Sequence, residues 1–314
     1  MMDHLIEKIE LTENPAVVGL DPTLDMIPPA LKKAAFEKHG KTPEGVAAML
    51  TCFNKAVIDA VGDLLPAVKP QIAMYERYGL PGLSSYIETI EYAKSKGLIV
   101  IGDIKRGDIA STAEAYAAHV GGTVIEGELF DCWKEDAVTV NPYFGTDGIA
   151  PFAENCKKYN KGIFILIRTS NKSSHEIQEL PVKIGDSFKP LCCHVADLVN
   201  DWGKNMIGKR GYSLIGAVVG ATHKDQGAAL RAQLPNTFFL VPGYGAQGGT
   251  GADLKGYFAK DGLGIIVNSS RGITGAWQKD KDMAEDPELG TEFAEASRKA
   301  VIAMREDLRL AMEG

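Results

Sequence analysis

Cysteine is scarce in this 314-residue chain, and the few copies are not arranged as a disulfide framework or a zinc site. The five cysteines are odd in number and form no Cys-x-x-Cys pair. They are Cys52, Cys132, Cys156, Cys192 and Cys193. The six histidines do not cluster at the spacing of metal ligands either. We therefore expect a reducing compartment and no bound metal.

Long hydrophobic runs and clusters of basic residues are also missing. The longest apolar run, Ile163 to Ile167, is far too short to span a bilayer, and Met1 to Glu10 is a mixed polar stretch rather than a secretory leader. Lys and Arg number 34 against 41 Asp and Glu, which gives a net charge of −7 and a pI near 5.5. This balance argues against a nucleic acid or an anionic membrane as partner, but a local basic pocket could still bind a small acidic metabolite. We expect a cytoplasmic protein.

No composition shift, low-complexity tract or Gly/Ser linker divides the chain. Its 45% apolar and 24% charged residues are ordinary for a globular protein of a size that needs no disulfides to bury a core. We expect one domain over residues 1–314, with its core at about 10–275 and a final helix at about 287–312, for which Asp286 is a possible N-cap. Three polar, Pro-containing stretches are longer than a strand-to-helix loop needs: residues 22–41, 171–190 and 272–287.

Eight short β-branched or aliphatic runs recur along the chain, and most are followed by a segment with helical spacing. The runs are Ala16 to Leu20, Leu64 to Lys69, Leu98 to Ile104, Ala137 to Asn141, Gly162 to Arg168, Leu214 to Val219, Thr237 to Val241 and Leu263 to Asn268. Eight alternating units of strand and helix are the number that closes a parallel (β/α)₈ barrel, the TIM-barrel fold. The helices after the fourth and seventh strands look short.

Helix signals between the runs agree with this fold. The clearest helical segment carries apolar residues at steps of three or four from Val46 to Leu64. Thr42 precedes Pro43 at a first helical position, which predicts a helix start there. Ser111 stands three residues before Glu114, in the register of a capping box.

In such a barrel the chemistry lies at the carboxyl ends of the strands, and the third strand ends with unusual charge. Side chains alternate along a strand, so Asp103 and Lys105 should leave one face together, roughly 6 to 7 Å apart, and point into the barrel mouth. A solvated strand-to-helix loop is the alternative. Unpaired charge on an inward face would cost several kcal/mol, however, so these groups should pair with Lys69 and Asp108 in an alternating network. Such a network fixes a lysine ammonium in place, as a general acid requires.

A second informative region follows the last two strands. The stretch from Val241 to Gly249 is rich in glycine, and Arg271 comes shortly after the eighth strand. Main-chain N–H groups of a glycine loop can close on an anion, and an arginine can pair with phosphate through two hydrogen bonds. Because the loops after strands seven and eight are where barrels commonly bind phosphate, we expect a phosphate group here.

Together these residues resemble the orotidine 5'-phosphate decarboxylase family. The stretch from Asp103 to Thr112 is similar to that family's signature Asp-x-Lys-x-x-Asp-Ile-x-x-Thr. The similarity covers about residues 10–275 and includes groups after five other strands in the family's order. These are Asp21, Lys69, Thr169 with Ser170, Pro242 through Gln247, and Arg271. The extra loops and the Arg-Thr-Ser-Asn form after strand five resemble the longer bacterial subgroup.

The resemblance implies decarboxylation of orotidine 5'-phosphate (OMP) to UMP and CO₂, in pyrimidine biosynthesis, without a cofactor. It implies that Lys105 protonates C6 of the pyrimidine, that Asp103 lies beside the departing carboxylate, and that Lys69 and Asp108 complete the array. It further implies a homodimer in which Asp108, Ile109 and Thr112 reach the partner's site. The implied substrate contacts are Asp21 and Lys69 for the ribose and Ser170 for the pyrimidine. For the phosphate and its neighbouring carbonyl they are Gln247, Ser270 and Arg271. Pro242, in the loop of Gln247, is a further substrate-binding residue.

Two alternatives remain open at this point. A sugar-phosphate aldolase or decarboxylase of the same suprafamily shares Asp-x-Lys-x-x-Asp but uses magnesium, held partly by an acidic residue after strand two. Lys69 occupies that place and would repel a metal ion. A non-catalytic phosphate-binding barrel would bind its ligand without turnover, and has no need of the array around Lys105.

Overall fold

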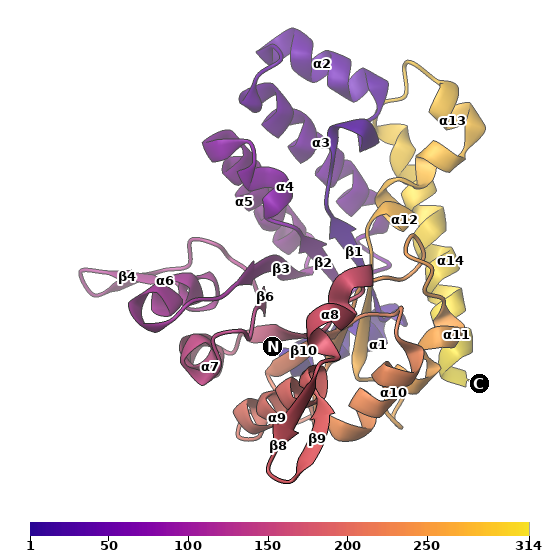
Figure 1. The fold of residues 1–314 in the computed structure, drawn as a ribbon. Helices are drawn as coiled ribbons and strands as arrows, with labels where there is room; N and C mark the ends of the chain where they lie inside the picture. The colour runs from indigo at the N-terminus through magenta and orange to yellow at the C-terminus, as the bar shows by residue number, and fades with distance from the viewer. Residues whose placement is uncertain (314) are drawn as a thin grey trace.

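Eight parallel strands close into a barrel in this computed structural model, which describes residues 1–313 (Figure 1). Around the barrel the order is β1-β12-β11-β10-β7-β6-β3-β2. The strands are β1 (Ala16–Leu20), β2 (Ala67–Pro70), β3 (Ile99–Arg106), β6 (Ala137–Val140), β7 (Gly162–Arg168), β10 (Ile215–Val219), β11 (Phe239–Val241) and β12 (Ile265–Ser269). They coincide with the eight runs identified in the sequence, so the expected (β/α)₈ TIM barrel is confirmed.

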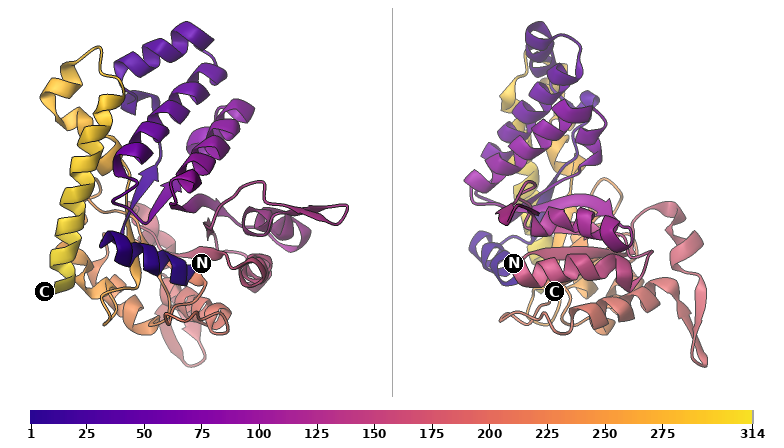
Figure 2. Two further views of the ribbon diagram at one scale, coloured as in Figure 1. Left: turned by 180° about the vertical axis from the view of Figure 1, so that it is seen from behind. Right: turned by 90° about the vertical axis from the view of Figure 1, so that its left-hand side faces the viewer.

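Helices surround the barrel and cover its outer face (Figures 1 and 2). They are α1 (Met2–Thr12), α2 (Pro29–His39), α3 (Pro43–Val61), α4 (Ala73–Glu76), α5 (Gly79–Ser95), α6 (Ala110–Gly121), α7 (Thr146–Tyr159), α8 (His175–Gln178), α9 (Leu191–Gly203), α10 (Lys224–Gln233), α11 (Gly251–Leu254), α12 (Arg271–Thr274), α13 (Lys281–Glu285) and α14 (Ala294–Glu313). None of them, within residues 1–313, combines the length and apolar composition needed to cross a membrane.

The clearest helix of the sequence, α3, forms as its signals predict. The Thr42 hydroxyl accepts a hydrogen bond from the Gly45 amide at 3.2 Å, and Pro43 occupies the first turn. The apolar stripe of α3 is buried, and Phe53 within it stacks on Phe293 with ring centroids 4.6 Å apart. The stripe therefore binds α3 both to the barrel and to the segment that leads into α14.

The N-terminal helix α1 was not expected, because Met1 to Glu10 reads as a mixed polar stretch. Its apolar residues nevertheless recur at helical spacing, and Met2, Leu5, Ile6 and Ile9 are buried. They pack against the inward side chains of the strands, including Phe164 of β7. In the view from behind, α1 crosses one end of the barrel (Figure 2, left). It closes the barrel's amino-terminal end and leaves the carboxyl ends of the strands for function.

Four local expectations were wrong. The helix after the fourth strand, α7, is 14 residues long and continues through Pro151. Ser111 is not a helix cap, because it lies inside α6, which starts at Ala110 with Ile109 as its N-cap. The final helix starts at Ala294 rather than near residue 287, after a 3₁₀ turn at Thr291–Phe293. Asp286 is accordingly no N-cap of α14, and its carboxylate accepts from the Glu288 amide instead.

The polar stretches contain regular structure of their own. Residues 22–41 include α2, and 171–190 include α8 and an antiparallel hairpin of β8 (Pro181–Ile184) with β9 (Ser187–Pro190). A second hairpin, β4 (Thr123–Ile125) with β5 (Glu128–Phe130), follows α6 and is exposed on both strands. Both hairpins project from the body of the molecule (Figures 1 and 2).

Candidate functional site

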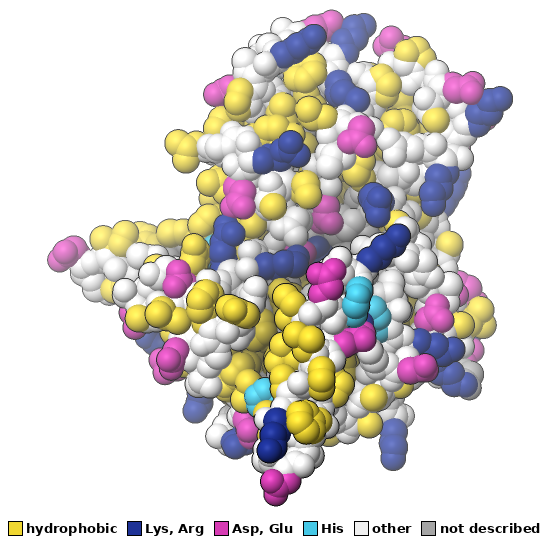
Figure 3. Space-filling view, in the orientation of Figure 1, with side chains coloured by type: hydrophobic (Ala, Val, Ile, Leu, Met, Phe, Trp, Pro, Cys, Tyr) yellow, Lys and Arg dark blue, Asp and Glu magenta, His cyan; other side chains and the backbone are white. Residues whose placement is uncertain are grey.

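A cavity of about 660 Å³ opens at the carboxyl ends of the barrel strands. Its apolar walls include Leu166, Val218 and Leu240 from neighbouring strands. Nine of the residues predicted from the sequence line it: Asp21, Lys69, Asp103, Lys105, Ser170, Pro242, Gln247, Ser270 and Arg271. Lys and Arg side chains gather near the middle of this face of the molecule (Figure 3). The cavity thus brings together groups that are up to 250 residues apart in the chain.

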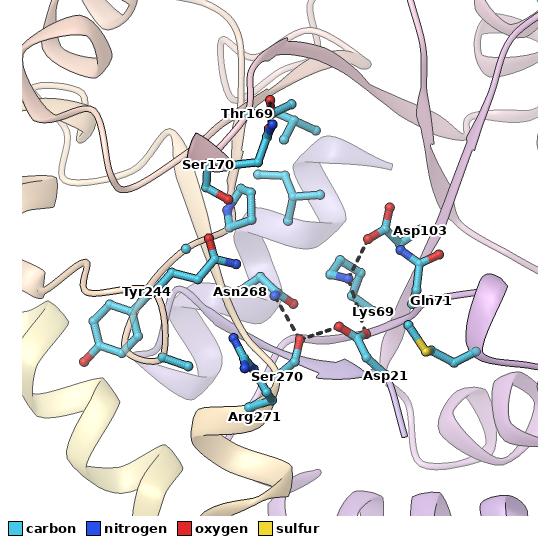
Figure 4. Close-up of a pocket in the computed structure, with 18 of the residues that line it drawn as sticks. Asp21, Lys69, Gln71, Asp103, Thr169, Ser170, Tyr244, Asn268, Ser270 and Arg271 are labelled. Carbon is cyan, nitrogen blue, oxygen red and sulfur yellow. Dashed lines mark hydrogen bonds and ion pairs between the residues drawn. The ribbon is translucent and has the colours of Figure 1, made fainter. Parts of the chain in front are cut away.

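Alternating charges form the centre of the site. The Lys69 ammonium donates to Asp103 Oδ2 at 2.8 Å, and the Lys105 ammonium donates to Asp103 Oδ1 at 2.5 Å. Asp21 Oδ1 lies 3.7 Å from Lys69 Nζ on the other side (Figure 4). Lys69 and Asp103 are 3% and 7% exposed, whereas the Lys105 side chain is 45% exposed toward the cavity. Lys105 is therefore the more accessible of the two ammonium groups in the cavity.

The neighbouring charges keep the Asp103 carboxylate and the Lys69 ammonium ionised. Burial alone would raise the pKa of Asp103, but the Lys69 and Lys105 charges outweigh it and hold that pKa well below its usual value. Burial alone would lower the pKa of Lys69, and the carboxylates of Asp103 and Asp21 outweigh it and raise that pKa instead. Asp103 and Lys69 therefore carry fixed charge at neutral pH.

The third strand departs from regular geometry where it supplies the array. Lys105 has a φ of 46°, in the left-handed region that non-glycine residues seldom adopt. The pairing of β3 with β6 also shifts register between Gly102 and Arg106. Asp103 and Lys105 therefore meet through a bulge rather than through the simple alternation expected from the sequence.

A second hydrogen-bonded chain orients Asp21. The Ser270 hydroxyl donates to Asp21 Oδ2 at 2.7 Å, and the Asn268 amide donates to Ser270 Oγ at 3.3 Å (Figure 4). Gly19 makes room for this chain, because a Cβ at that position would come within 2.0 Å of Ser270 Oγ. The Ser270 side chain thus contacts a carboxylate within the protein.

The glycine-rich loop after β11 folds back on itself. Gly243, Gly245 and Gly248 all have positive φ, which glycine alone adopts without strain. The Tyr244 hydroxyl donates to Asp307 of α14 at 2.8 Å, and that carboxylate also accepts from the Gly251 amide. The C-terminal helix therefore holds the loop in place.

One polar side chain of this loop, Gln247, and one beside it, Arg271, remain exposed. Gln247 and Arg271 both line the cavity, and the Arg271 guanidinium has no hydrogen bond or ion pair with any residue of the described chain. Its donors are therefore free to meet an anion at the cavity edge.

Ser170 sits where three backbone segments approach closely. A Cβ on Gly220 or Gly243 would come within 2.9 or 3.0 Å of the Ser170 Cβ. The preceding residue, Thr169, is held by Gln178, whose amide accepts from the Thr169 amide at 2.9 Å and donates to its hydroxyl at 2.7 Å. The segment that faces the cavity is rigidly placed.

A buried arginine supports that segment from behind. Arg168 is 1% exposed, and its guanidinium hydrogen-bonds to side chains of the α8 region and of the start of α10. These partners are Gln226, Ser174, Gln178, Glu179 and His223. Burial and the Arg168 charge lower the pKa of His223, so that ring stays neutral beside the guanidinium.

Three predicted residues lie outside the cavity. Asp108, Ile109 and Thr112 occupy the turn after β3 and the start of α6, and the Asp108 carboxylate accepts from the Ile109 amide at 2.7 Å. Within one chain, Asp108 therefore does not join the network of Asp103, Lys69 and Lys105.

Several cavity residues were missed by the sequence analysis, and Gln71, Thr139 and Asn268 are among the polar ones. Thr139 is the polar residue of the strand β6, and Asn268 follows the apolar residues Ile265 to Val267 of β12, and that was the signal available. Among residues 1–313 no three His, Cys, Asp or Glu side chains are grouped to hold a metal ion.

Comparison with known proteins gives consistent matches over nearly the whole chain. A family model described as "Orotidine 5'-phosphate decarboxylase / HUMPS family" matches residues 18–285. A protein of Petrotoga mobilis named orotidine 5'-phosphate decarboxylase is 44% identical over 310 residues, which cover 98% of each chain. A protein of the same name from Clostridium perfringens is 43% identical over 312 residues, or 99% of this chain and 98% of the other. The solved OMP decarboxylase of Leishmania donovani superposes with a TM-score of 0.69 at 30% identity, covering 97% of this chain and 98% of that one.

Proposed function

This chain belongs to the orotidine 5'-phosphate decarboxylase / HUMPS family, and from that premise we propose that it converts OMP to UMP and CO₂, with Lys105 protonating C6. The enzyme class is that of a carboxy-lyase. The observation that carries the assignment of the acid is the alternating array of Asp21, Lys69, Asp103 and Lys105 at the cavity centre.

The chemistry needs such an array because loss of CO₂ leaves a carbanion at C6 with no adjacent π system to delocalise it. A preformed electric field can stabilise charge that develops in the transition state, without reorganisation. The Lys105 ammonium is held 2.5 Å from Asp103, whose other oxygen is occupied by Lys69. Lys105 can then supply both the field and the proton, while Asp103 lies beside the departing carboxylate.

Recognition of the phosphate and the base is assigned to the side of the cavity opposite the charged array. We propose that Arg271 and Gln247 hold the phosphate beside the loop that begins at Pro242, and that Ser170 contacts the pyrimidine. Asp21 and Lys69 would bind ribose hydroxyls. The Ser270 hydroxyl already donates to Asp21, so the Ser270 side chain supports the ribose contact. The backbone amide would then be the group of Ser270 that binds the phosphate.

A homodimer with shared sites would give Asp108, Ile109 and Thr112 their role. Their position on the rim outside their own cavity supports this proposal. So does the apolar surface beside them, where Ile109 is 51%, Tyr143 84% and Phe144 46% exposed. A two-fold partner that covers this surface could receive Asp108 in its own cavity.

Two rivals to this function were left open by the sequence. One is a magnesium-dependent sugar-phosphate aldolase or decarboxylase of the same suprafamily, and the other, from another class, is a non-catalytic phosphate-binding barrel. A magnesium-dependent reaction would need an acidic residue where Lys69 stands, and an ammonium there would repel the cation. A binding-only protein would have no use for an ammonium fixed at the cavity centre.

Incubation of EDTA-treated protein with OMP tests the proposal directly. Loss of pyrimidine absorbance is expected without added metal. Lys105→Ala should lower turnover by many orders of magnitude, because it removes the proton donor while the phosphate and ribose contacts persist. The assignment of the acid would be wrong if Lys105→Ala kept even a tenth of the wild-type turnover.

We propose that residues 1–314 form one domain. Support comes from the two terminal helices, since α1 packs into the barrel end and α14 contacts both α3 and the loop after β11. Neither helix has a separate core of its own within the described residues.

A further inference from the structure

Thr139 lies opposite the bulge that carries Asp103 and Lys105. Gly102 of β3 pairs with Val138 of β6, and the next pair is Arg106 with Val140. Three residues of β3 therefore face the single residue Thr139. On its other side Thr139 pairs regularly with Phe164 of β7, so its backbone is fixed within the sheet.

The bulge removes a backbone hydrogen bond from the ladder, and the Thr139 side chain replaces it. The Lys105 amide donates to Thr139 Oγ1 at 3.0 Å, and the Thr139 hydroxyl donates to Asp103 Oδ1 at 2.8 Å. Because the oxygen accepts from the amide, its proton is directed to the carboxylate. Thr139 itself is 1% exposed, and its bond to Asp103 is buried, so both partners depend on the Thr139 hydroxyl.

These bonds close a ring around the proposed acid. From the Lys105 amide the ring runs through Thr139 Oγ1 to Asp103 Oδ1, and from there back to the Lys105 ammonium. We infer that Thr139 is a positioning residue for the decarboxylation, which holds the strained Lys105 backbone and the Asp103 carboxylate in one fixed geometry. This inference rests on the proposed function, in which Lys105 is the acid.

The physical need for Thr139 follows from the Lys105 conformation. A non-glycine residue at φ 46° persists only where its surroundings hold it there. Without the hydroxyl, the Lys105 amide would lose its partner in a partly buried place, and the buried Asp103 carboxylate would lose one of its three donors. Both losses let the ammonium leave the place where it meets C6, and a small misplacement of a reacting group has a large effect on rate.

A matched set of variants separates hydrogen bonding from packing. Thr139→Val keeps the shape and removes the hydroxyl, whereas Thr139→Ser keeps the hydroxyl and removes the methyl group. We expect Thr139→Val to lower kcat for OMP by about 10- to 100-fold with KM changed less than about threefold, since the phosphate contacts lie elsewhere. Thr139→Ser should stay within about threefold of the wild type.

Thr51→Val serves as the control for loss of a buried hydroxyl. Thr51 bonds Ser85 at 2.8 Å between α3 and α5, remote from the cavity, so its removal should leave kcat unchanged. Hydrogen–deuterium exchange supplies a readout independent of activity. The amide of Lys105 should exchange faster in Thr139→Val, and keep wild-type protection in Thr139→Ser and Thr51→Val.

Wild-type kcat in a folded Thr139→Val protein would overturn the inference, as would equal damage in Thr139→Ser. Folding is checked by circular dichroism and by binding of UMP. If Thr139→Val does not fold, Thr139→Cys replaces it, since a thiol is a weak donor of similar size. In that case kcat equal to that of Thr139→Ser contradicts the role. No turnover of OMP by the wild-type protein would instead refute the proposed function, and the exchange experiment would still test the ring.

Discussion

Subunit mixing tests whether Asp108 acts on the cavity of a partner. In its own chain this carboxylate lies outside the cavity and accepts a hydrogen bond from the Ile109 amide. Asp108→Asn keeps an oxygen that can accept the same bond, so the turn should survive and only the charge is lost. Lys105→Ala, in contrast, removes the proposed acid from the cavity of its own chain.

The expected recovery follows from the arrangement of a two-fold dimer. Each homodimeric variant should be nearly inactive. A mixed dimer has one cavity with both defects and one with neither. With random pairing of an equimolar mixture, half of the dimers are mixed and half of their cavities are intact. Roughly a quarter of the wild-type activity should therefore return. The assay is loss of OMP absorbance after refolding, relative to wild-type protein treated in the same way.

A pair of variants that affect the same cavity supplies the control. Lys69→Ala and Lys105→Ala both alter groups of one array, so mixing them leaves a defect in every cavity of a mixed dimer and should restore nothing. Native mass spectrometry of tagged chains shows whether subunits exchange. If they do exchange, and the Asp108→Asn mixture stays as inactive as its parents, Asp108 acts within its own chain and the shared-site proposal fails.

Two further predictions concern charge. Arg271→Ala should cost roughly 2 to 4 kcal/mol of phosphate binding and raise KM for OMP by about 30- to 1000-fold. It should leave turnover of the unphosphorylated nucleoside and the melting temperature nearly unchanged, and equal damage to both substrates would mean that Arg271 is structural. The lowered pKa of Asp103 predicts stability that is fully present above about pH 4, near the pKa of an unfolded aspartate. That stability is lost as the pH falls further toward the folded pKa. Urea unfolding between pH 7 and pH 3 should show a shallower acid loss in Asp103→Asn, and an identical slope would contradict the assignment.

The barrel could be predicted because each strand is a short, fully buried run of apolar residues. Parallel strands buried on both faces read as continuous β-branched stretches, which few other elements resemble. α1 was missed although Leu5, Ile6 and Ile9 recur at helical spacing, because the charged residues between them dominate so short a segment. The β4–β5 hairpin was also missed. Its turn is formed by Glu126 and Gly127, which both adopt the positive φ of a tight turn, and the sequence does not show these angles directly.

The site could be predicted only as far as charge at strand ends reveals it. Lys69, Asp103 and Lys105 stand out because charged groups follow apolar runs, and the structure brings them together. Thr139 did not stand out, since its role depends on a bulge in the neighbouring strand. Spacing along one strand says nothing about register with the next. The roles given to the individual residues remain predictions until the variants are measured.

The division of labour around the cavity follows the order of the chain. The charged array and Thr139 come from four adjacent strands, β1, β2, β3 and β6, whereas the groups assigned to phosphate and base follow β7, β11 and β12. Under the proposed roles, one half of the barrel holds the reaction centre and the ribose contacts on the sheet, and the other half holds the phosphate and base contacts on loops. For directed evolution, the phosphate and base contacts would then be separable from the reaction centre. Randomising residues 169–171 should change which heterocyclic bases are accepted, and randomising residues 243–249 should change which acidic groups are accepted, while the proposed reaction centre stays in place.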